Sequence, residues 1–204
     1  MDSEFSIEVL PIHRQKGFDR STLAGAYAAS APRRAARVRK KDHLILFVSF
    51  HGQLVSDERQ RAMLEKLAQG YYATEGTVTA ALTLLAENLN QFLLKQNGRV
   101  ADPAQQLVAM VTMLVVREGR LVIAQCGPSH VIALDGRKAD DYQSGAAGGR
   151  GLGVARNAQI RFHQLGLQPG LLLVVTAQVP AAWNQAVFQG LERQPLLELS
   201  LIHI

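Results

Sequence analysis

The sequence predicts an α+β fold in which antiparallel sheets are layered with helices. Short apolar or alternating segments, typical of strands, lie towards both ends of the chain. Between them lie two segments with the periodicity of amphipathic helices, and turns that contain glycine join several of the strands. This order favours a layered sandwich over a doubly wound parallel sheet.

Length and composition are those of one globular domain. The chain has 204 residues, of which 48% are hydrophobic and 19% charged, so we expect a single domain over residues 1–204. The one cysteine, Cys126, excludes an internal disulfide framework and fits a reducing compartment. The acidic N-terminus lacks the apolar core of a secretory signal, and no apolar run reaches about 18 residues. We therefore expect a cytoplasmic protein without membrane contact.

Three strands and a helix are predicted in the first third of the chain. Residues 5–12 alternate polar and apolar side chains, and residues 23–30 are small and apolar. Residues 43–50 form a continuous apolar run of β-forming side chains, which predicts a central strand. Residues 57–69 have helical periodicity, and Gly70 is expected to end that helix.

The clearest helix is predicted at residues 77–96. Thr77 is a suitable N-cap, and Asn97-Gly98 supplies residues that commonly end helices. Apolar side chains recur at spacings of three and four and should form one buried stripe: Val78, Leu82, Leu85, Leu89, Phe92 and Leu93.

Strands dominate the remainder. They are predicted at residues 107–116, 121–126, 130–134, 159–165 and 171–176. A hairpin loop at 117–120 joins the first two, and residues 181–189 predict a short helix. The glycine-rich residues 148–153 are interpreted as a turn and not as a nucleotide site, because a polar segment precedes them and a strand follows.

Six cations crowd one short segment: Arg33, Arg34, Arg37, Arg39, Lys40 and Lys41. One interpretation is a solvated loop or an edge that discourages aggregation. The other is a site for phosphate or for a phosphorylated or acidic partner. No aromatic side chains alternate with these cations, so we expect no nucleic-acid partner.

The histidines and the cysteine carry no metal or nucleophile signature. The six histidines lack zinc-site spacing, and Cys126 has no nearby ligand partner. Cys126 is interpreted as a small core residue. A nucleophile pair of Cys126 with His130 remains an alternative, although no orienting partner is marked.

One hairpin resembles a motif of the PPM-type metal-dependent phosphatases, the protein phosphatase 2C family. Residues 122–136 are similar to the family's "A-x-V-G-D-S-R-x-Y-L-x-x-x-G", with Pro128 in place of the aspartate. The resemblance extends, in the family's order, over about residues 20–190.

Three further segments carry the resemblance. Residues 37–42 are similar to "R-x-x-N-E-D" and keep Arg37 and Asp42. The strand before Gly52 is similar to "V-x-D-G-x-G-G", with Phe50 for the aspartate. The last segment, around the predicted strand at 171–176, is similar to "G-D-x-L-L-L-x-S-D-G", with Ala177 for the aspartate.

The resemblance implies a layered α-β-β-α sandwich that is truncated at the C-terminus, with residues 200–204 a non-native tail. It also implies that Arg37 binds phosphate, that Asp42 ligates metal, and that Phe50, Pro128 and Ala177 stand at degenerate ligand positions. Family members use two divalent cations, Mg²⁺ or Mn²⁺, which need several carboxylate oxygens. One aspartate beside two lysines should not hold them.

Our first hypothesis is therefore a catalytically inactive PPM-type domain, a pseudophosphatase without metal cofactor. It would act in binding or regulation on a protein partner that is phosphorylated or acidic. The second hypothesis is an active Mg²⁺- or Mn²⁺-dependent serine/threonine phosphatase whose ligands lie elsewhere, with Asp135, Asp140 and Asp141 as the nearby acidic substitutes. The third is an unrelated α+β binding domain.

Overall fold

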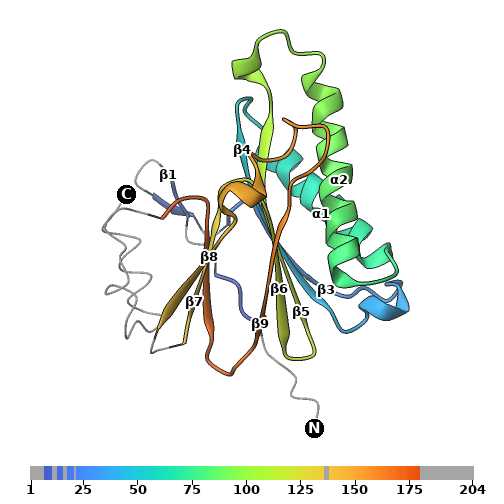
Figure 1. Cartoon of the computed structure of the whole chain (residues 1–204), viewed down its shortest axis with the longest axis vertical. Coiled ribbons are helices and arrows are strands. Elements are labelled where there is room, and N and C mark those ends of the chain that lie inside the picture. Colours follow the sequence, from blue (N-terminus) through green and yellow to red (C-terminus); the bar gives the residue numbers. More distant parts are fainter. Residues whose placement is uncertain (1–6, 11–12, 16–17, 21, 136–137, 180–204) are drawn as a thin grey trace.

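The computed structural model describes residues 7–10, 13–15, 18–20, 22–135 and 138–179. Two antiparallel sheets pack face to face, and two helices cover the outer face of the larger sheet (Figure 1). The larger sheet has the strand order β3-β4-β5-β6-β9 and the smaller one β10-β7-β8. The predicted α+β sandwich of antiparallel sheets is confirmed.

The strands of the larger sheet are β3 (Ala26–Ser30), β4 (His43–His51), β5 (Val108–Arg117), β6 (Arg120–Cys126) and β9 (Arg161–Gly166). Those of the smaller sheet are β7 (His130–Leu134), β8 (Ala139–Gln143) and β10 (Leu172–Thr176). A separate hairpin pairs β1 (His13–Gln15) with β2 (Phe18–Arg20). Within the described ranges, helices cover the larger sheet only, and the helix predicted at 181–189 lies outside them.

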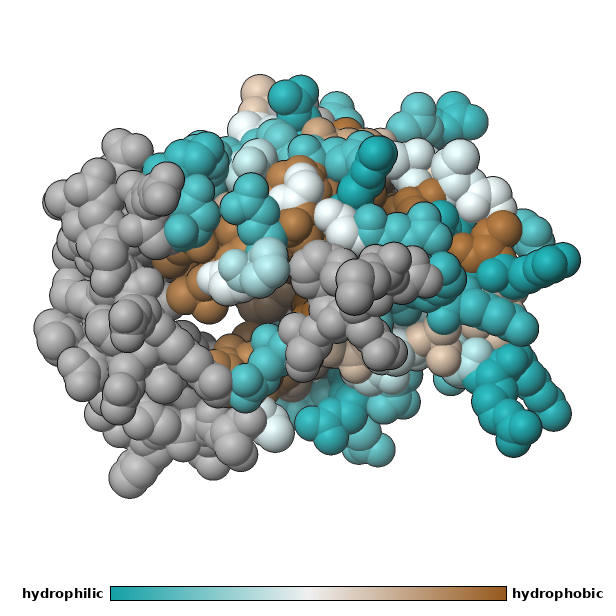
Figure 2. Space-filling view, turned by 90° about the horizontal axis from the view of Figure 1, so that it is seen from below, coloured by the Kyte–Doolittle hydropathy of each residue, from teal (hydrophilic) through white to brown (hydrophobic). Residues whose placement is uncertain are grey.

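Side-chain alternation on the central strands divides the apolar residues between two cores. On β5, Val111, Met113 and Val115 face the helices, whereas Leu114 and Val116 face the smaller sheet. Because β5 is covered on both faces, it reads as an almost continuous apolar run. Figure 2 shows the molecule from below. On the face of the molecule that it presents, apolar residues line a hollow, and hydrophilic residues lie above and below it.

The first helix, α1 (Asp57–Ala73), starts with a side-chain cap and runs past its predicted end. Ser56 accepts a hydrogen bond from the Arg59 N–H, and acidic residues in the first turn suit the helix dipole. The prediction that Gly70 ends the helix is wrong. Tyr71 and Tyr72 are buried, and their packing outweighs the low helix propensity of glycine.

The second helix, α2 (Val78–Asn97), has the predicted N-cap, Thr77, whose side chain accepts from the Ala80 N–H. It contacts β5 and β6, as expected for a helix packed on one sheet. The predicted stripe is buried except for Phe92, which is 45% exposed. Phe92 lies one residue, about 100° around the helix, from Leu93, so it falls outside the covered face.

Among the described residues, three 3₁₀ turns accompany the two helices: η1 (Arg37–Arg39), η2 (Pro103–Gln105) and η3 (Gly145–Gly148). No helix in the described part of the chain has the length and apolar character needed to cross a bilayer.

Some strand predictions were wrong in extent. Residues 7–10, inside the strand predicted at 5–12, are not in a strand, and β3 begins three residues later than predicted. The strand β8 was not predicted, because its sequence Ala-Asp-Asp-Tyr-Gln is polar and carries no clear alternation. An edge strand of this kind forms through backbone pairing with its neighbour, here β7.

The glycine-rich loop is a turn held by two buried asparagines of α2. The Asn97 amide donates to the carbonyls of Leu107 (2.9 Å) and Gly153 (2.8 Å), and its oxygen accepts from the Leu107 N–H (2.8 Å). The Asn90 oxygen accepts from the Gly153 N–H (2.7 Å). Gly153 has a φ of +92°, and a Cβ there would lie 2.7 Å from the Leu107 carbonyl, so glycine is required.

We expect Asn97→Ala to destabilise the protein by about 3 kcal/mol, because it leaves buried polar groups of Leu107 and Gly153 without partners. Guanidinium denaturation followed by circular dichroism measures the loss. Asn88→Ala, on the exposed side of the same helix, is the matched control and should change stability by less than about 0.5 kcal/mol. An equal loss in both variants would contradict the role assigned to Asn97.

Candidate functional site

Two of the three degenerate ligand positions lie on either side of β5. Phe50, next to last in β4, pairs with Ala109 near the start of β5. Pro128 lies in the turn after β6, two residues beyond Cys126, which pairs with Val111 of β5. Both positions therefore lie at the end of the sandwich that points upward in Figure 1.

The third position comes to the same end from the smaller sheet. Ala177 follows Thr176, the last residue of β10, which pairs with His130 at the start of β7. Because β7 begins directly after the Pro128 turn, the register brings Ala177 beside that turn. Segments far apart in sequence thus meet where the resemblance to PPM phosphatases implies one site.

Buried hydroxyl and amide groups, not carboxylates, hold this end together. The Gln125 amide donates to the Ser129 carbonyl (3.1 Å), the Ser129 hydroxyl (3.0 Å) and the Tyr142 carbonyl (3.1 Å). The Thr112 hydroxyl donates to the Ser129 hydroxyl (3.0 Å). In the described part of the chain, the Gln125 side-chain oxygen has no hydrogen-bond partner. The network ties the β6–β7 turn to both sheets.

The residues at this end do not fit a pair of hard divalent cations. Such cations require several carboxylate or carbonyl oxygens, and the side chains of Phe50, Pro128 and Ala177 supply none. Among the described residues, no three His, Cys, Asp or Glu side chains gather as a group that could hold a metal ion. No reaction step through a metal follows from this geometry.

The acidic substitutes proposed from the sequence have other partners. Asp141 accepts from His130 (2.9 Å) and from the Gln143 amide (2.7 Å). Asp140 forms an ion pair with Lys138 (2.6 Å), and Asp135 accepts from the Lys138 N–H (2.9 Å). These contacts are local to β7, β8 and their connection.

Asp42 lies at the other end of β4. It precedes the strand, whereas Phe50 is eight positions further on, which corresponds to roughly 26 Å at about 3.3 Å per residue. One metal site therefore cannot contain both Asp42 and Phe50. In the PPM family, the two motifs that these residues match belong to the same site. The structure does not bring Asp42 or Arg37 together with Phe50, Pro128 and Ala177.

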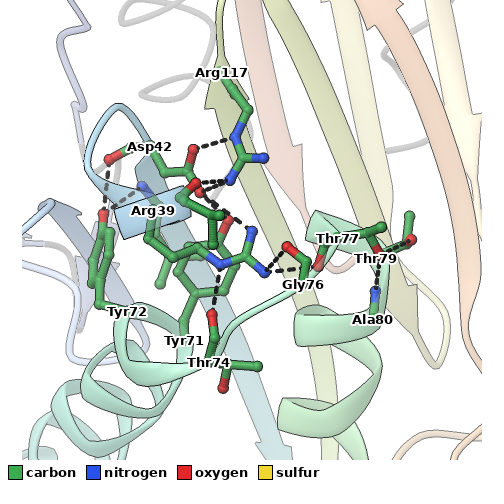
Figure 3. Close-up of polar contacts among 12 residues, drawn as sticks. Arg39, Asp42, Tyr71, Tyr72, Thr74, Gly76, Thr77, Thr79, Ala80 and Arg117 are labelled. Carbon is green, nitrogen blue, oxygen red and sulfur yellow. Dashed lines mark hydrogen bonds and ion pairs between the residues drawn. The ribbon is translucent and has the colours of Figure 1, made fainter. Parts of the chain in front are cut away.

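The Asp42 carboxylate is buried and fully engaged (Figure 3). Arg117 donates from Nε to Oδ1 (2.5 Å) and from Nη2 to Oδ2 (2.6 Å), and the Tyr71 hydroxyl donates to Oδ2 (2.6 Å). Arg39 Nη1 lies 3.6 Å from Oδ2. A metal at Asp42 would have to displace these partners. Metal ligation by Asp42 stays a prediction, and the pairing with Arg117, Tyr71 and Arg39 argues against it.

Arg39 is not one of the exposed cations of the basic segment. Its side chain is fully buried and donates to the carbonyls of Thr74 (3.0 Å), Gly76 (3.0 Å) and Thr77 (2.7 Å). Its guanidinium also lies over the Tyr71 ring, 4.8 Å from the centroid. Arg39 therefore ties the β3–β4 loop to the connection between α1 and α2.

The two tyrosines of this cluster stay protonated at physiological pH. Burial raises the pKa of Tyr71 well above its ordinary value, and the hydrogen bond to Asp42 raises it further. Burial raises the pKa of Tyr72 to about 12. The Asp42 carboxylate, by its hydrogen bonds, raises the pKa of Arg117. Arg39, Asp42, Tyr71 and Arg117 are therefore interpreted as a structural cluster, which we call the clamp.

Sequence reasoning missed the partners of Asp42. Arg117 is 75 residues away in sequence, and no local spacing marks such a pair. The exposed Arg37 lies on the loop beside this clamp, so phosphate binding by Arg37 stays a prediction for a surface far from Phe50.

Cys126 is a core residue, as the sequence indicated. It is buried in the core between the helices and the larger sheet, and burial raises the pKa of its thiol to about 12.

We expect Asp42→Asn to cost roughly 3–5 kcal/mol, because Arg39 and Arg117 lose the carboxylate that balances them in a buried setting. Urea denaturation measures the change, and a double-mutant cycle with Arg117→Met should show strong coupling. The exposed Glu75→Gln is the control, with a change below about 0.5 kcal/mol. Additive effects in the cycle would contradict the clamp.

The Cys126 thiol should resist alkylation in the folded protein. The unfolded thiol ionises near 9.0, whereas the folded one does so only near 12, so raising the pH between these values should not expose a thiolate. Between these two pH values the unfolded chain loses the thiol proton while the folded protein keeps it, so the unfolded state becomes more favourable. The contribution of Cys126 to stability should therefore fall as the pH rises from about 9 to about 12. Iodoacetamide labelling with and without guanidinium gives the readout; rapid labelling of the native protein at pH 8 would contradict it.

No protein-family model and no curated protein matches the sequence. Solved structures do match the fold. The S. agalactiae serine/threonine phosphatase has a TM-score of 0.61 at 12% identity, covering 90% of this chain and 87% of that one. The serine/threonine phosphatase Stp1 from Staphylococcus aureus has a TM-score of 0.50 at 14% identity, covering 81% and 79%.

A third match is PppA, described as a key regulatory component of the T6SS in Pseudomonas aeruginosa, with a TM-score of 0.50 at 13% identity and coverage of 74% of both chains. At such low identities the matches show the fold alone. Over most of its length, this chain has the fold of bacterial PPM-type serine/threonine phosphatases.

Proposed function

We propose that the chain is a degenerate PPM-type domain that does not hydrolyse phosphate esters and instead binds or regulates a protein partner. The observation that carries the proposal is the meeting of Phe50, Pro128 and Ala177 at one end of the sandwich. Their convergence matches the resemblance, and their side chains lack ligand oxygens.

The chemistry of the family explains why these substitutions matter. Metal-assisted hydrolysis needs bound cations that activate water and neutralise phosphoryl oxygens. The retained aspartate of the motif match, Asp42, lies roughly 26 Å from Phe50 and is paired with two arginines. The proposal therefore includes no metal cofactor. Membership of the PPM family and a cytoplasmic location are part of the same proposal.

The partner is proposed to be a protein that is phosphorylated or acidic. Support comes from the exposed cations of the segment before β4 and from the formal net charge of +5. The alternative of an unrelated α+β fold is not supported, since the structural match covers 90% of the chain. An active phosphatase remains the competing outcome of the test below.

The wild-type protein should release no phosphate from p-nitrophenyl phosphate or a phosphoserine peptide with Mn²⁺, and titration calorimetry should show no tight Mn²⁺ binding. The triple variant Phe50→Asp/Pro128→Asp/Ala177→Asp restores carboxylates to the converging positions and should gain Mn²⁺ affinity. A variant with Leu84→Asp, Phe92→Asp and Leu54→Asp adds the same charge at exposed apolar positions and should not. Wild-type turnover with micromolar Mn²⁺ affinity would refute the proposal.

A further inference from the structure

The basic loop, residues 31–42, joins β3 to β4 at the end of the sandwich opposite Phe50. Its backbone is held by hydrogen bonds within the loop and to α1. The Ala35 N–H donates to the Pro32 carbonyl (2.9 Å), the Ala36 N–H to the Tyr72 carbonyl (2.7 Å), and the Arg39 N–H to the Ala36 carbonyl (2.8 Å). The loop thus has a defined shape.

Buried anchors fix the loop from beneath. Arg39 and Asp42 have no exposed side-chain surface, and Ala35 is 8% exposed. Arg117 adds a hydrogen bond from Nη2 to the Val38 carbonyl (2.6 Å). Because the backbone is already ordered, a ligand that binds here need not order it.

Besides Lys41, which lies 3.7 Å from Glu118, the loop presents four exposed cations: Arg33, Arg34, Arg37 and Lys40. None of these four has an ion pair with another described residue. Residues 31–41 contain no acidic side chain. Uncompensated cations of this kind attract anions, and arginine grips a phosphate or carboxylate with two parallel hydrogen bonds.

The clamp beneath the loop adds to the positive field. It contains two guanidinium groups, Arg39 and Arg117, against the single carboxylate of Asp42, which leaves one positive charge. The N-terminus of α2 lies at the same place and has no acidic residue in its first turn. The C-terminus of α1 also ends here and offsets that helix dipole, so the side-chain charges decide the field.

The surroundings limit the size of the ligand. Val38, 43% exposed, lies among the cations and offers an apolar contact. The exposed Glu75 and Glu118 bound the patch: Glu75 precedes the Gly76 carbonyl that Arg39 contacts, and Glu118 lies 3.7 Å from Lys41. A long nucleic-acid backbone needs a continuous basic stripe. A compact patch with an apolar centre suits a short peptide.

We propose that the basic loop is the docking surface for a phosphorylated or acidic peptide. Arg33, Arg34, Arg37 and Lys40 would bind its negative groups while an apolar side chain packs on Val38. This inference rests on the binding function proposed above and places the partner at the end of the sandwich opposite the degenerate ligand positions.

The test uses a fluorescein-labelled peptide with one phosphoserine flanked by leucines, and the same peptide with serine. The loop variant is Arg33→Gln/Arg34→Gln/Arg37→Gln/Lys40→Gln. Its control is Arg59→Gln/Lys66→Gln/Lys95→Gln/Arg99→Gln, which removes four exposed cations from the helices and the turn after α2. Each variant lowers the formal net charge from +5 by four, to +1.

Fluorescence anisotropy should show that the phosphopeptide binds more tightly than the serine peptide and more weakly at high salt. Its Kd should rise at least about tenfold in the loop variant and less than about twofold in the control. The single variant Arg37→Glu should also weaken binding. Thermal melts of all variants should match the wild type, because the substituted side chains are exposed.

Three outcomes would overturn the docking surface: no binding at low salt, equal losses in loop variant and control, or stronger loop-dependent binding of duplex RNA or phosphatidylserine vesicles than of the phosphopeptide. Phosphate release is measured in the same samples. If the protein binds the phosphopeptide through the loop and also releases phosphate, the non-hydrolysing function is refuted and the docking surface stands. If it neither binds the peptide nor releases phosphate, the docking surface is refuted and the non-hydrolysing function stands.

Discussion

The end of the sandwich at which β4 begins depends on the contacts of one buried group, the carboxylate of Asp42. It joins Arg117 at the end of β5, Tyr71 near the end of α1, and Arg39 in the β3–β4 loop. Arg39 in turn satisfies carbonyls between the two helices. A single charge thereby connects the sheet, the helical layer and the loop. Removing the carboxylate would leave the two guanidinium groups of Arg39 and Arg117 without their counter-charge, and breaking a buried charge group in this way is costlier than never having built it.

The clamp also holds the backbone of the basic segment, through the Arg117 hydrogen bond to the Val38 carbonyl and the pairing of Arg39 with Asp42. Where several cations crowd one loop, mutual repulsion normally favours a mobile, solvated chain. In this protein the Arg39 side chain of the segment points inward and is buried in the clamp, whereas the other cations of the segment are exposed at the surface. The opposite end of the sandwich has the contrary character, with uncharged residues at the positions where the family keeps acids.

Local patterns allowed the sequence to predict most elements, because β4, β5 and α2 carry strong periodicity and clear caps. It failed where tertiary packing decides: Gly70 inside α1, the exposed Phe92, and the polar strand β8. For the site, aligned motifs anticipated that Phe50, Pro128 and Ala177 share one end. They could not reveal that Asp42 faces Arg117, since that pairing is created by strand register across 75 residues.

The order of elements has a consequence for folding kinetics. The central strands β4 and β5 pair along nine residues, yet both helices lie between them in sequence. Their pairing therefore closes a long loop, whose entropic cost is reduced once α1 and α2 have formed and packed. We expect the helical hairpin to assemble early and the centre of the larger sheet to zip up afterwards. The rate-limiting event would then be the meeting of two strands that are spatial neighbours but remote along the chain.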